Sequence, residues 1–82
     1  MGSNGGNGML PLGFLPIGRE GVVKEITGGP GLRRRLADLG FARGAVVRVI
    51  QNDRGPLIVA LGDSRVALGY GMAQKVMVEE LP

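Results

Sequence analysis

Arginine side chains are the residues of this sequence best suited to chemistry. Arg33, Arg34 and Arg35 form a triplet that carries the densest charge of the chain. Guanidinium groups form charge-assisted, often paired hydrogen bonds with carboxylates and phosphates, so the triplet is a candidate patch for an acidic surface, a phosphate or nucleic acid. The alternative is a solvated helix face, on which Arg35 packs its stem along the fold and pairs with Asp38 or Asp63.

Side chains for catalysis or metal binding are scarce. The chain contains 0 His and 0 Cys, and its serines are Ser3 and Ser64. Ser64 falls in a predicted hairpin turn with no base to activate it, so we expect it to form a turn. The carboxylates are scattered over turns and the C-terminal end, which gives no support to a divalent-ion site. The sequence therefore predicts a protein that is not an enzyme, with no catalytic residue, no metal ligands and no cofactor, bound iron included. The carboxylates considered are Asp38, Asp53, Asp63, Glu79 and Glu80.

A helix must position the arginine triplet, and its signals lie between residues 28 and 44. Leucines recur at i, i+4 and i+7, which places them on one face of a helix. Pro30 suits the first turn, Gly40 suits the position just after the last turn, and Phe41 is expected to pack back on the helix. A helix this short is marginal in water, so its leucine face must pack on the rest of the chain. The predicted structural residues are Leu32, Leu36, Leu39, Gly40, Phe41 and Gly44.

The glycine-rich loop at residues 28–31 is a second place where an anion could bind, because helix N-termini attract negative charge. The loop lacks the Lys-Ser/Thr ending of a phosphate-binding loop. We therefore expect it to serve as a turn that leads into the helix.

Short strands separated by turn residues account for most of the remaining chain. Simple alternation places Val23 and Ile26 on opposite faces of the first strand, and Val47 with Val49 on one face of the second. The third and fourth strands are expected to form a hairpin. Short strands at regular spacing indicate a mainly β fold, a small barrel of about five strands with one short capping α-helix after the first strand. The expected strands are residues 21–27, 45–50, 57–61, 65–68 and 76–80.

The N-terminal part of the chain divides into two pieces. Residues 1–8 contain almost nothing to bury, so we interpret them as a flexible leader or tag remnant before a single domain at residues 9–82. Residues 9–17 are apolar but interrupted by Pro and Gly, which favours an extended arm over a helix. We expect the arm to contribute to the core, the alternative being an exposed patch for docking or self-association.

Composition limits both stability and binding. A chain of 82 residues forms one small domain with a thin core, here aliphatic because hydrophobic residues make up 44% and aromatic residues 4%. The net charge of +3 is a mild basic bias, and the scarcity of aromatic residues argues against binding single-stranded nucleic acid. No run approaches the roughly 18 apolar residues that a membrane-spanning helix needs.

An ordered series of motifs in this chain resembles a known family, the ferrous iron transport protein A (FeoA) family. The match extends over residues 9–80. In the centre it rests on Arg34, Arg35, Leu36, Leu39, Gly40, Phe41, Gly44, Val47 and Val49. Elsewhere it rests on Leu15, Gly18, Val22, Val23, Pro56, Gly62, Ala67, Leu68, Ala73, Val76 and Val78.

This resemblance implies an SH3-like β-barrel and a cytoplasmic, non-enzymatic accessory protein of ferrous iron uptake. The implied partner is the cytoplasmic G-protein domain of a FeoB-type membrane transporter, which would recruit the protein to the inner face of the membrane. Arg33, Arg34 and Arg35 are then the candidate partner-binding residues. Similar SH3-like domains end metal-dependent transcriptional repressors, so a free-standing regulatory module is an alternative, as is a basic-patch nucleic-acid binder. A homo-oligomer is left open, because strand edges and the apolar arm offer surfaces for one.

Overall fold

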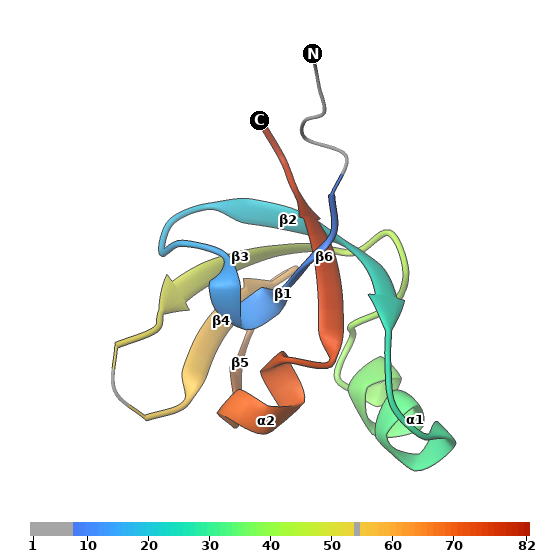
Figure 1. Ribbon diagram of the computed structural model, residues 1–82. Helices are drawn as coiled ribbons and strands as arrows, with labels where there is room; N and C mark the ends of the chain where they lie inside the picture. Colours follow the sequence, from blue (N-terminus) through green and yellow to red (C-terminus); the bar gives the residue numbers. More distant parts are fainter. Residues whose placement is uncertain (1–7, 54) are drawn as a thin grey trace.

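One antiparallel sheet of six strands organises the protein, for which a computed structural model describes residues 8–53 and 55–82 (Figure 1). The predicted leader lies outside the described residues except for its last position. The strand order is β1-β6-β2-β3-β4-β5, so β1 and β5 form the two edges. In chain order the elements are β1 (Leu10–Pro11), the 3-10 helix η1 (Leu12–Phe14), β2 (Glu20–Ile26), α1 (Pro30–Asp38), β3 (Val46–Gln51), β4 (Leu57–Leu61), β5 (Ser64–Leu68), α2 (Tyr70–Ala73) and β6 (Val76–Glu80).

The prediction of a mainly β fold with a short helix after a strand is confirmed. α1 follows β2 and projects from one side of the sheet, apart from the single turn of α2 (Figure 1). The sheet has one strand more than expected, because residues of the arm pair with β6 as β1. It also stays open, because its two edge strands are not paired with each other.

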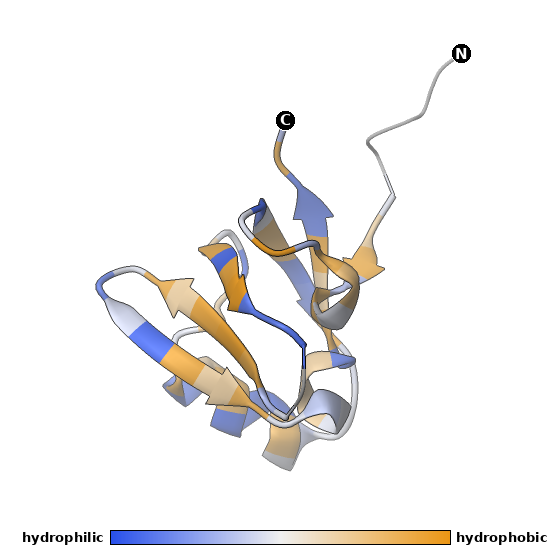
Figure 2. Cartoon of the chain, turned by 90° about the vertical axis from the view of Figure 1, so that its left-hand side faces the viewer, coloured by the Kyte–Doolittle hydropathy of each residue, from blue (hydrophilic) through white to orange (hydrophobic). Residues whose placement is uncertain are grey.

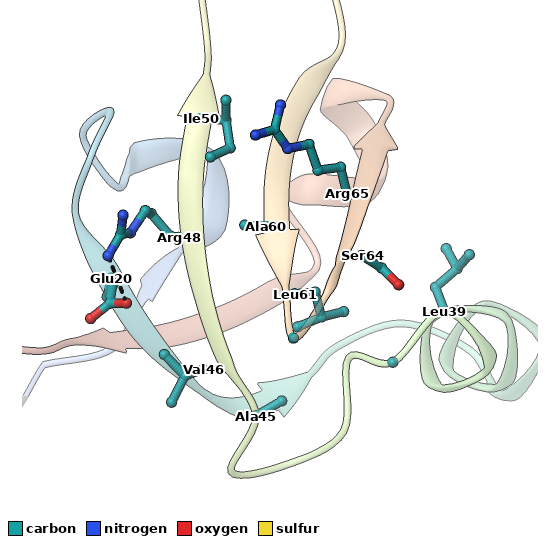
Figure 3. Close-up of a pocket in the computed structure, with 12 residues that line it drawn as sticks. Glu20, Leu39, Ala45, Val46, Arg48, Ile50, Ala60, Leu61, Ser64 and Arg65 are labelled. Carbon is teal, nitrogen blue, oxygen red and sulfur yellow. Dashed lines mark hydrogen bonds and ion pairs between the residues drawn. The ribbon is translucent and has the colours of Figure 1, made fainter.

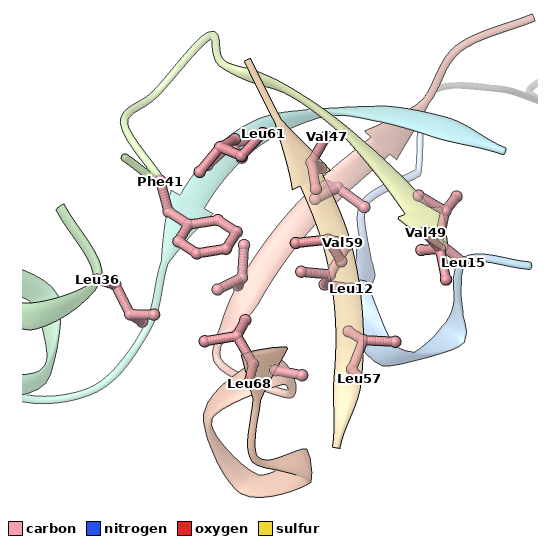
Figure 4. Close-up of a cluster of buried hydrophobic side chains, with 14 residues drawn as sticks. Leu12, Leu15, Leu36, Phe41, Val47, Val49, Leu57, Val59, Leu61 and Leu68 are labelled. Carbon is pink, nitrogen blue, oxygen red and sulfur yellow. The ribbon is translucent and has the colours of Figure 1, made fainter. Parts of the chain in front are cut away.

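Alternating side chains of the strands build an aliphatic core. Val47 and Val49 are fully buried on β3, as expected, and Val76 and Val78 are fully buried on β6. The strands carry much of the hydrophobic character in Figure 2. No polar or charged side chain is buried in the part of the chain that the structure describes. The core, shown in Figure 4, comprises Leu12, Leu15, Val23, Leu36, Phe41, Val47, Val49, Leu57, Val59, Leu61, Leu68, Ala73, Val76 and Val78.

β2 departs from simple alternation because it contains a bulge. Val23 lies opposite Val78 and Glu25 lies opposite Met77, so Lys24 is an extra residue with no partner on β6. The extra residue turns Ile26 to the side of Val23, where it packs against the core. The expectation that these two side chains occupy opposite faces is therefore wrong.

The apolar arm is divided between core and surface. Leu12 and Leu15 are fully buried, and the side-chain amide of Asn52 donates a hydrogen bond of 3.0 Å to the carbonyl oxygen of Gly13. Phe14 and Ile17 are 62% and 57% exposed. The 3-10 turn causes this division, because it replaces the two-residue alternation of an extended arm by a three-residue period.

α1 ends in a left-handed turn that fixes it on the sheet. Gly40 has φ +108°, its N–H donates to the Ala37 carbonyl, and the Phe41 N–H donates to the Leu36 carbonyl over 3.0 Å. These two bonds define a Schellman motif, in which the residues at the two ends of the longer bond usually pack together. Leu36 and Phe41 are accordingly both fully buried.

The leucine stripe of α1 reaches the core only in its middle. Leu36 is buried, Leu32 is half-buried, and Leu39 is 41% exposed. The expectation that Leu39 belongs to the core is wrong, because the last turn of α1 lies beside the β4–β5 turn, where Leu39 lines an open groove with Leu61, Gly62 and Ser64.

The left-handed turn yields a stability prediction. Gly40→Ala should lower the free energy of unfolding by about 1–2 kcal/mol or more, because φ is positive and the new Cβ would lie 2.9 Å from Leu61 Cδ2. Gly31→Ala in the same helix is the matched control. Nothing lies within 4 Å of its Cβ position, so it should stabilise by about 0.5–1 kcal/mol. Urea unfolding of both variants tests this, and equal midpoints would contradict it.

Burial along α1 yields a second prediction. Leu36→Ala should cost about 2–5 kcal/mol, because it opens a cavity in a fully packed site. Leu39→Ala should cost much less, about 1 kcal/mol at most, because its side chain already lies partly in solvent. Thermal unfolding measures both, and similar losses for the two variants would show that Leu39 is a core residue.

Candidate partner-binding groove

A basic groove lies between α1 and β2. It is open to solvent and has a volume of about 510 Å³. Its cationic side chains are Lys24, Arg33, Arg34 and Arg43, and its acidic side chain is Glu25. The apolar part of its lining is Val23, Ile26, Ala37, Phe41 and Ala42.

The helix geometry explains which arginines face this groove. Successive residues of an α-helix point about 100° apart, so Arg33, Arg34 and Ala37 share one side of α1. That side faces β2, and all three residues line the groove. Arg35 points away from this side and lies outside the groove. The predicted triplet is therefore split, with two members in the groove and one elsewhere on the exposed surface of the helix.

The arginine triplet takes no part in the ion pairs of the described chain. Those pairs join Arg19 to Glu80 at 2.7 Å, Lys24 to Glu79 at 3.4 Å, and Arg48 to Glu20 at 3.3 Å. Arg33, Arg34 and Arg35 are all exposed. The alternative in which Arg35 pairs with a carboxylate of Asp38 or Asp63 is not found among these pairs.

Sequence reasoning missed two cations of the groove. Lys24 is the bulged residue of β2, and Arg43 lies in the turn that follows Phe41. Their separation from the triplet in the sequence concealed them. The Lys24 ammonium is partly neutralised by Glu79 on β6, and both side chains are substantially exposed, so solvent weakens that pair. The groove therefore keeps an excess of positive charge.

Metal-ligating side chains do not cluster in the described ranges. No three of the Asp and Glu residues there lie close enough to hold an ion. Ser64 is the first residue of β5 rather than a turn residue, and its side chain is exposed beside Leu39 (Figure 3). None of the helices described has the length and apolar character needed to cross a membrane.

Comparison with known proteins gives a family match over residues 10–80, to the FeoA domain. A protein of Methanocaldococcus jannaschii that carries the name Fe(2+) transport protein A is 42% identical over 72 residues, which is 88% of each chain.

Solved structures agree with this match. The crystal structure of an iron uptake regulatory protein (FeoA) is 36% identical and superposes with a TM-score of 0.84 over 90% of this chain and 99% of that one. FeoA of Stenotrophomonas maltophilia, solved with zinc, is 32% identical with a TM-score of 0.73, over 83% and 87% of the two chains. That protein is described as an SH3 domain protein and a candidate activating factor of ferrous iron transport. The SH3-like part of the fold prediction is thereby confirmed.

A repressor shares the same fold. A manganese-dependent transcriptional repressor is 28% identical with a TM-score of 0.81, and the match covers 89% of this chain and 42% of the repressor. The predicted similarity to a domain of metal-dependent repressors is confirmed at the level of fold.

The exposed arginines of the groove yield a third prediction. The double change Arg33→Glu and Arg34→Glu should alter the free energy of unfolding by no more than about 0.5 kcal/mol, because both side chains are exposed and neither joins an ion pair in the described ranges. Chemical denaturation followed by circular dichroism measures it. A loss above about 1 kcal/mol would mean that these arginines serve the fold rather than a partner.

Proposed function

The chain belongs to the FeoA family, and on that premise we propose that it is a non-enzymatic accessory protein of ferrous iron transport. It acts in the cytoplasm, where it binds the cytoplasmic G-protein domain of a FeoB-type transporter at the inner face of the membrane. The basic groove between α1 and β2 is the docking site. Ferrous iron is the cargo of the transporter.

The observation that carries this proposal is the charge of the groove. Lys24, Arg33, Arg34 and Arg43 converge on it from β2, α1 and the following turn, against the one carboxylate of Glu25. Such an excess attracts an acidic surface, speeds the encounter with it and disfavours basic partners. Arg33 and Arg34 take part in none of the ion pairs among the described residues, so binding does not cost them a partner there.

The apolar part of the groove adds a contact of a different kind. Ala37 and Ala42 are its exposed apolar residues, whereas Phe41 is fully buried. An acidic partner segment with one or two apolar side chains can therefore pair its carboxylates with the rim and cover the small apolar area within it. Interfaces of this type combine an apolar centre with a polar rim.

The site also has little need to rearrange. α1 is held by the buried pair of Leu36 and Phe41, so Arg33 and Arg34 are presented from a fixed helix. A surface that is ordered before binding loses less conformational entropy when the partner docks. If the groove prefers one nucleotide state of the G domain, binding shifts the transporter toward that state by the ratio of the two affinities.

A second candidate function follows from the repressor similarity. On this alternative the module binds a segment of a regulatory protein rather than a transporter. Binding to a G domain in a nucleotide-dependent manner would favour the first candidate, whereas failure to bind the G domain in any state would favour the second.

The first candidate predicts a charge-dependent interaction. Arg34→Glu should weaken binding to the separately produced G domain by about tenfold, because it replaces attraction by repulsion at the rim. Arg33→Glu should act in the same direction, and raising the salt concentration should weaken the unmodified complex. Isothermal titration in the GDP-bound, GTP-analogue-bound and nucleotide-free states measures these effects.

The control for this titration is Lys75→Glu. Lys75 is exposed and is not among the residues that line the basic groove, so the variant makes the same change of charge away from the docking site. If Lys75→Glu and Arg34→Glu weakened G-domain binding equally, the effect would come from the net charge of the chain and not from the groove. Undiminished binding by the two arginine variants would refute docking at the groove.

A further inference from the structure

The outer edge of β5 carries backbone groups that have no partner strand. β5 is an edge strand and pairs only with β4. Leu61 and Ser64 close the two-residue turn between these strands, so they form a hydrogen-bonded pair, and such pairs alternate along an antiparallel ladder. It follows that the N–H and C=O groups of Arg65 and Ala67 point to the free side. None of the other backbone hydrogen bonds of the described residues involves these two positions.

A row of charged side chains crosses the outer face of the sheet and ends at this edge. The strand register aligns Glu20 on β2, Arg48 on β3, Ala60 on β4 and Arg65 on β5. Arg48 pairs with Glu20 at 3.3 Å, as the dashed line in Figure 3 marks, whereas Arg65 takes part in none of the ion pairs of the described chain. Opposite charges on neighbouring strands stabilise a sheet, so the next position beyond Arg65 suits a carboxylate.

A groove of about 830 Å³ contains this row, because Glu20, Arg48, Ala60 and Arg65 all line it. Val46 is 45% exposed and Leu39 is 41% exposed, so this lining is available for contact. Figure 3 places Leu39 beside Ser64, at the start of β5, and Ile50 near Arg65. The apolar residues of the lining are Leu39, Ala45, Val46, Ile50, Ala60 and Leu61.

The two edges of the sheet differ in how they are protected. β1 has two residues, one of which is Pro11, and short length and proline both discourage further strand pairing. β5 has five residues without proline, and Arg65 is its one charged side chain. Proteins usually protect exposed edges of this length, because their unpaired backbone groups can pair with another strand. The open edge of β5 is therefore available to a partner strand.

A second copy of the chain fits this edge poorly. If β5 paired antiparallel with another β5 through its free groups, Arg65 would lie opposite Ala67 on each side. The two Arg65 side chains would then stand diagonally across one face, and like charges at that spacing repel. Each copy also carries a net charge of +3. An acidic segment of a different sequence has neither disadvantage.

We therefore propose that the β5 edge binds an extended acidic segment of a partner protein as a seventh strand of the sheet. The segment makes backbone hydrogen bonds with Arg65 and Ala67 and pairs a carboxylate with the Arg65 guanidinium. Its alternate apolar side chains lie on the opposite face, the side of Ser64 and Leu39. In this mode, called strand addition, backbone bonds supply affinity and alternate side chains supply specificity. This surface is separate from the basic groove of α1 and β2.

The test uses a capped peptide of eight residues in which Glu and Val alternate, and fluorescence anisotropy with the full chain. The peptide should bind, a Lys/Val peptide of the same pattern should not, and N-methylation of the amides on one edge of the Glu/Val peptide should remove binding. Arg65→Glu should weaken binding by about tenfold. Ala67→Pro should do the same, because the lost N–H faces away from β4 and proline is tolerated on the free side of an edge strand.

Several outcomes would overturn the proposal. One is the absence of Glu/Val binding, and another is equal binding of the N-methylated peptide, which would indicate groove contact without strand addition. A dimer seen by sedimentation and dissolved by Ala67→Pro would assign the edge to a second copy.

Circular dichroism must show that each variant is folded, and if Ala67→Pro is not, the N-methylated peptide decides the question. Lys75→Glu should bind like the unmodified chain. The G-domain titration with Arg34→Glu probes the other surface, so either proposal can fail without the other.

Discussion

The left-handed turn at Gly40 is the constraint on which both candidate surfaces depend. It reverses the chain after α1 so that Leu36, inside the helix, and Phe41, just after it, enter the same core. The helix is then held in one orientation on the sheet. Its one side presents Arg33 and Arg34 toward β2, and its last turn sets Leu39 beside Ser64. A helix of nine residues would have little stability by itself, so this attachment determines whether either surface exists.

The sequence predicted the elements whose structure is locally determined. Val47 and Val49 alternate on an unbroken part of β3, and Pro30 and Gly40 mark the ends of α1 with residues of fixed conformational preference. The sequence did not predict structure that depends on contacts with another element of the fold. The bulge at Lys24 depends on how β2 meets β6, and the exposure of Leu39 depends on how far the sheet extends under α1. A periodic pattern identifies the apolar face of a helix but contains no information about the reach of the surface below it.

The candidate sites show the same division. Arg33 and Arg34 are adjacent in the chain, so a sequence reveals them as a cluster. Lys24 and Arg43 join them only because β2 and the turn after Phe41 fold against the helix. The row that ends at Arg65 is harder still to foresee. Its members come from four strands, and a shift of one residue in any register would move a side chain to the other face of the sheet.

The small aliphatic core explains why both proposed binding surfaces lie on the exterior of this protein. The inward positions of the sheet are occupied by aliphatic side chains, and the described chain buries no polar group that could be tuned for catalysis. What remains is the outer face, the open edge and the side of α1. These surfaces are suited to recognition by charge and by backbone pairing. The arginines already lie on ordered elements, so little conformational entropy is lost when a partner binds. α1 lines the basic groove, and Leu39 just after it lines the groove beside β5, so the turn that attaches the helix to the sheet orders both surfaces together before any partner binds.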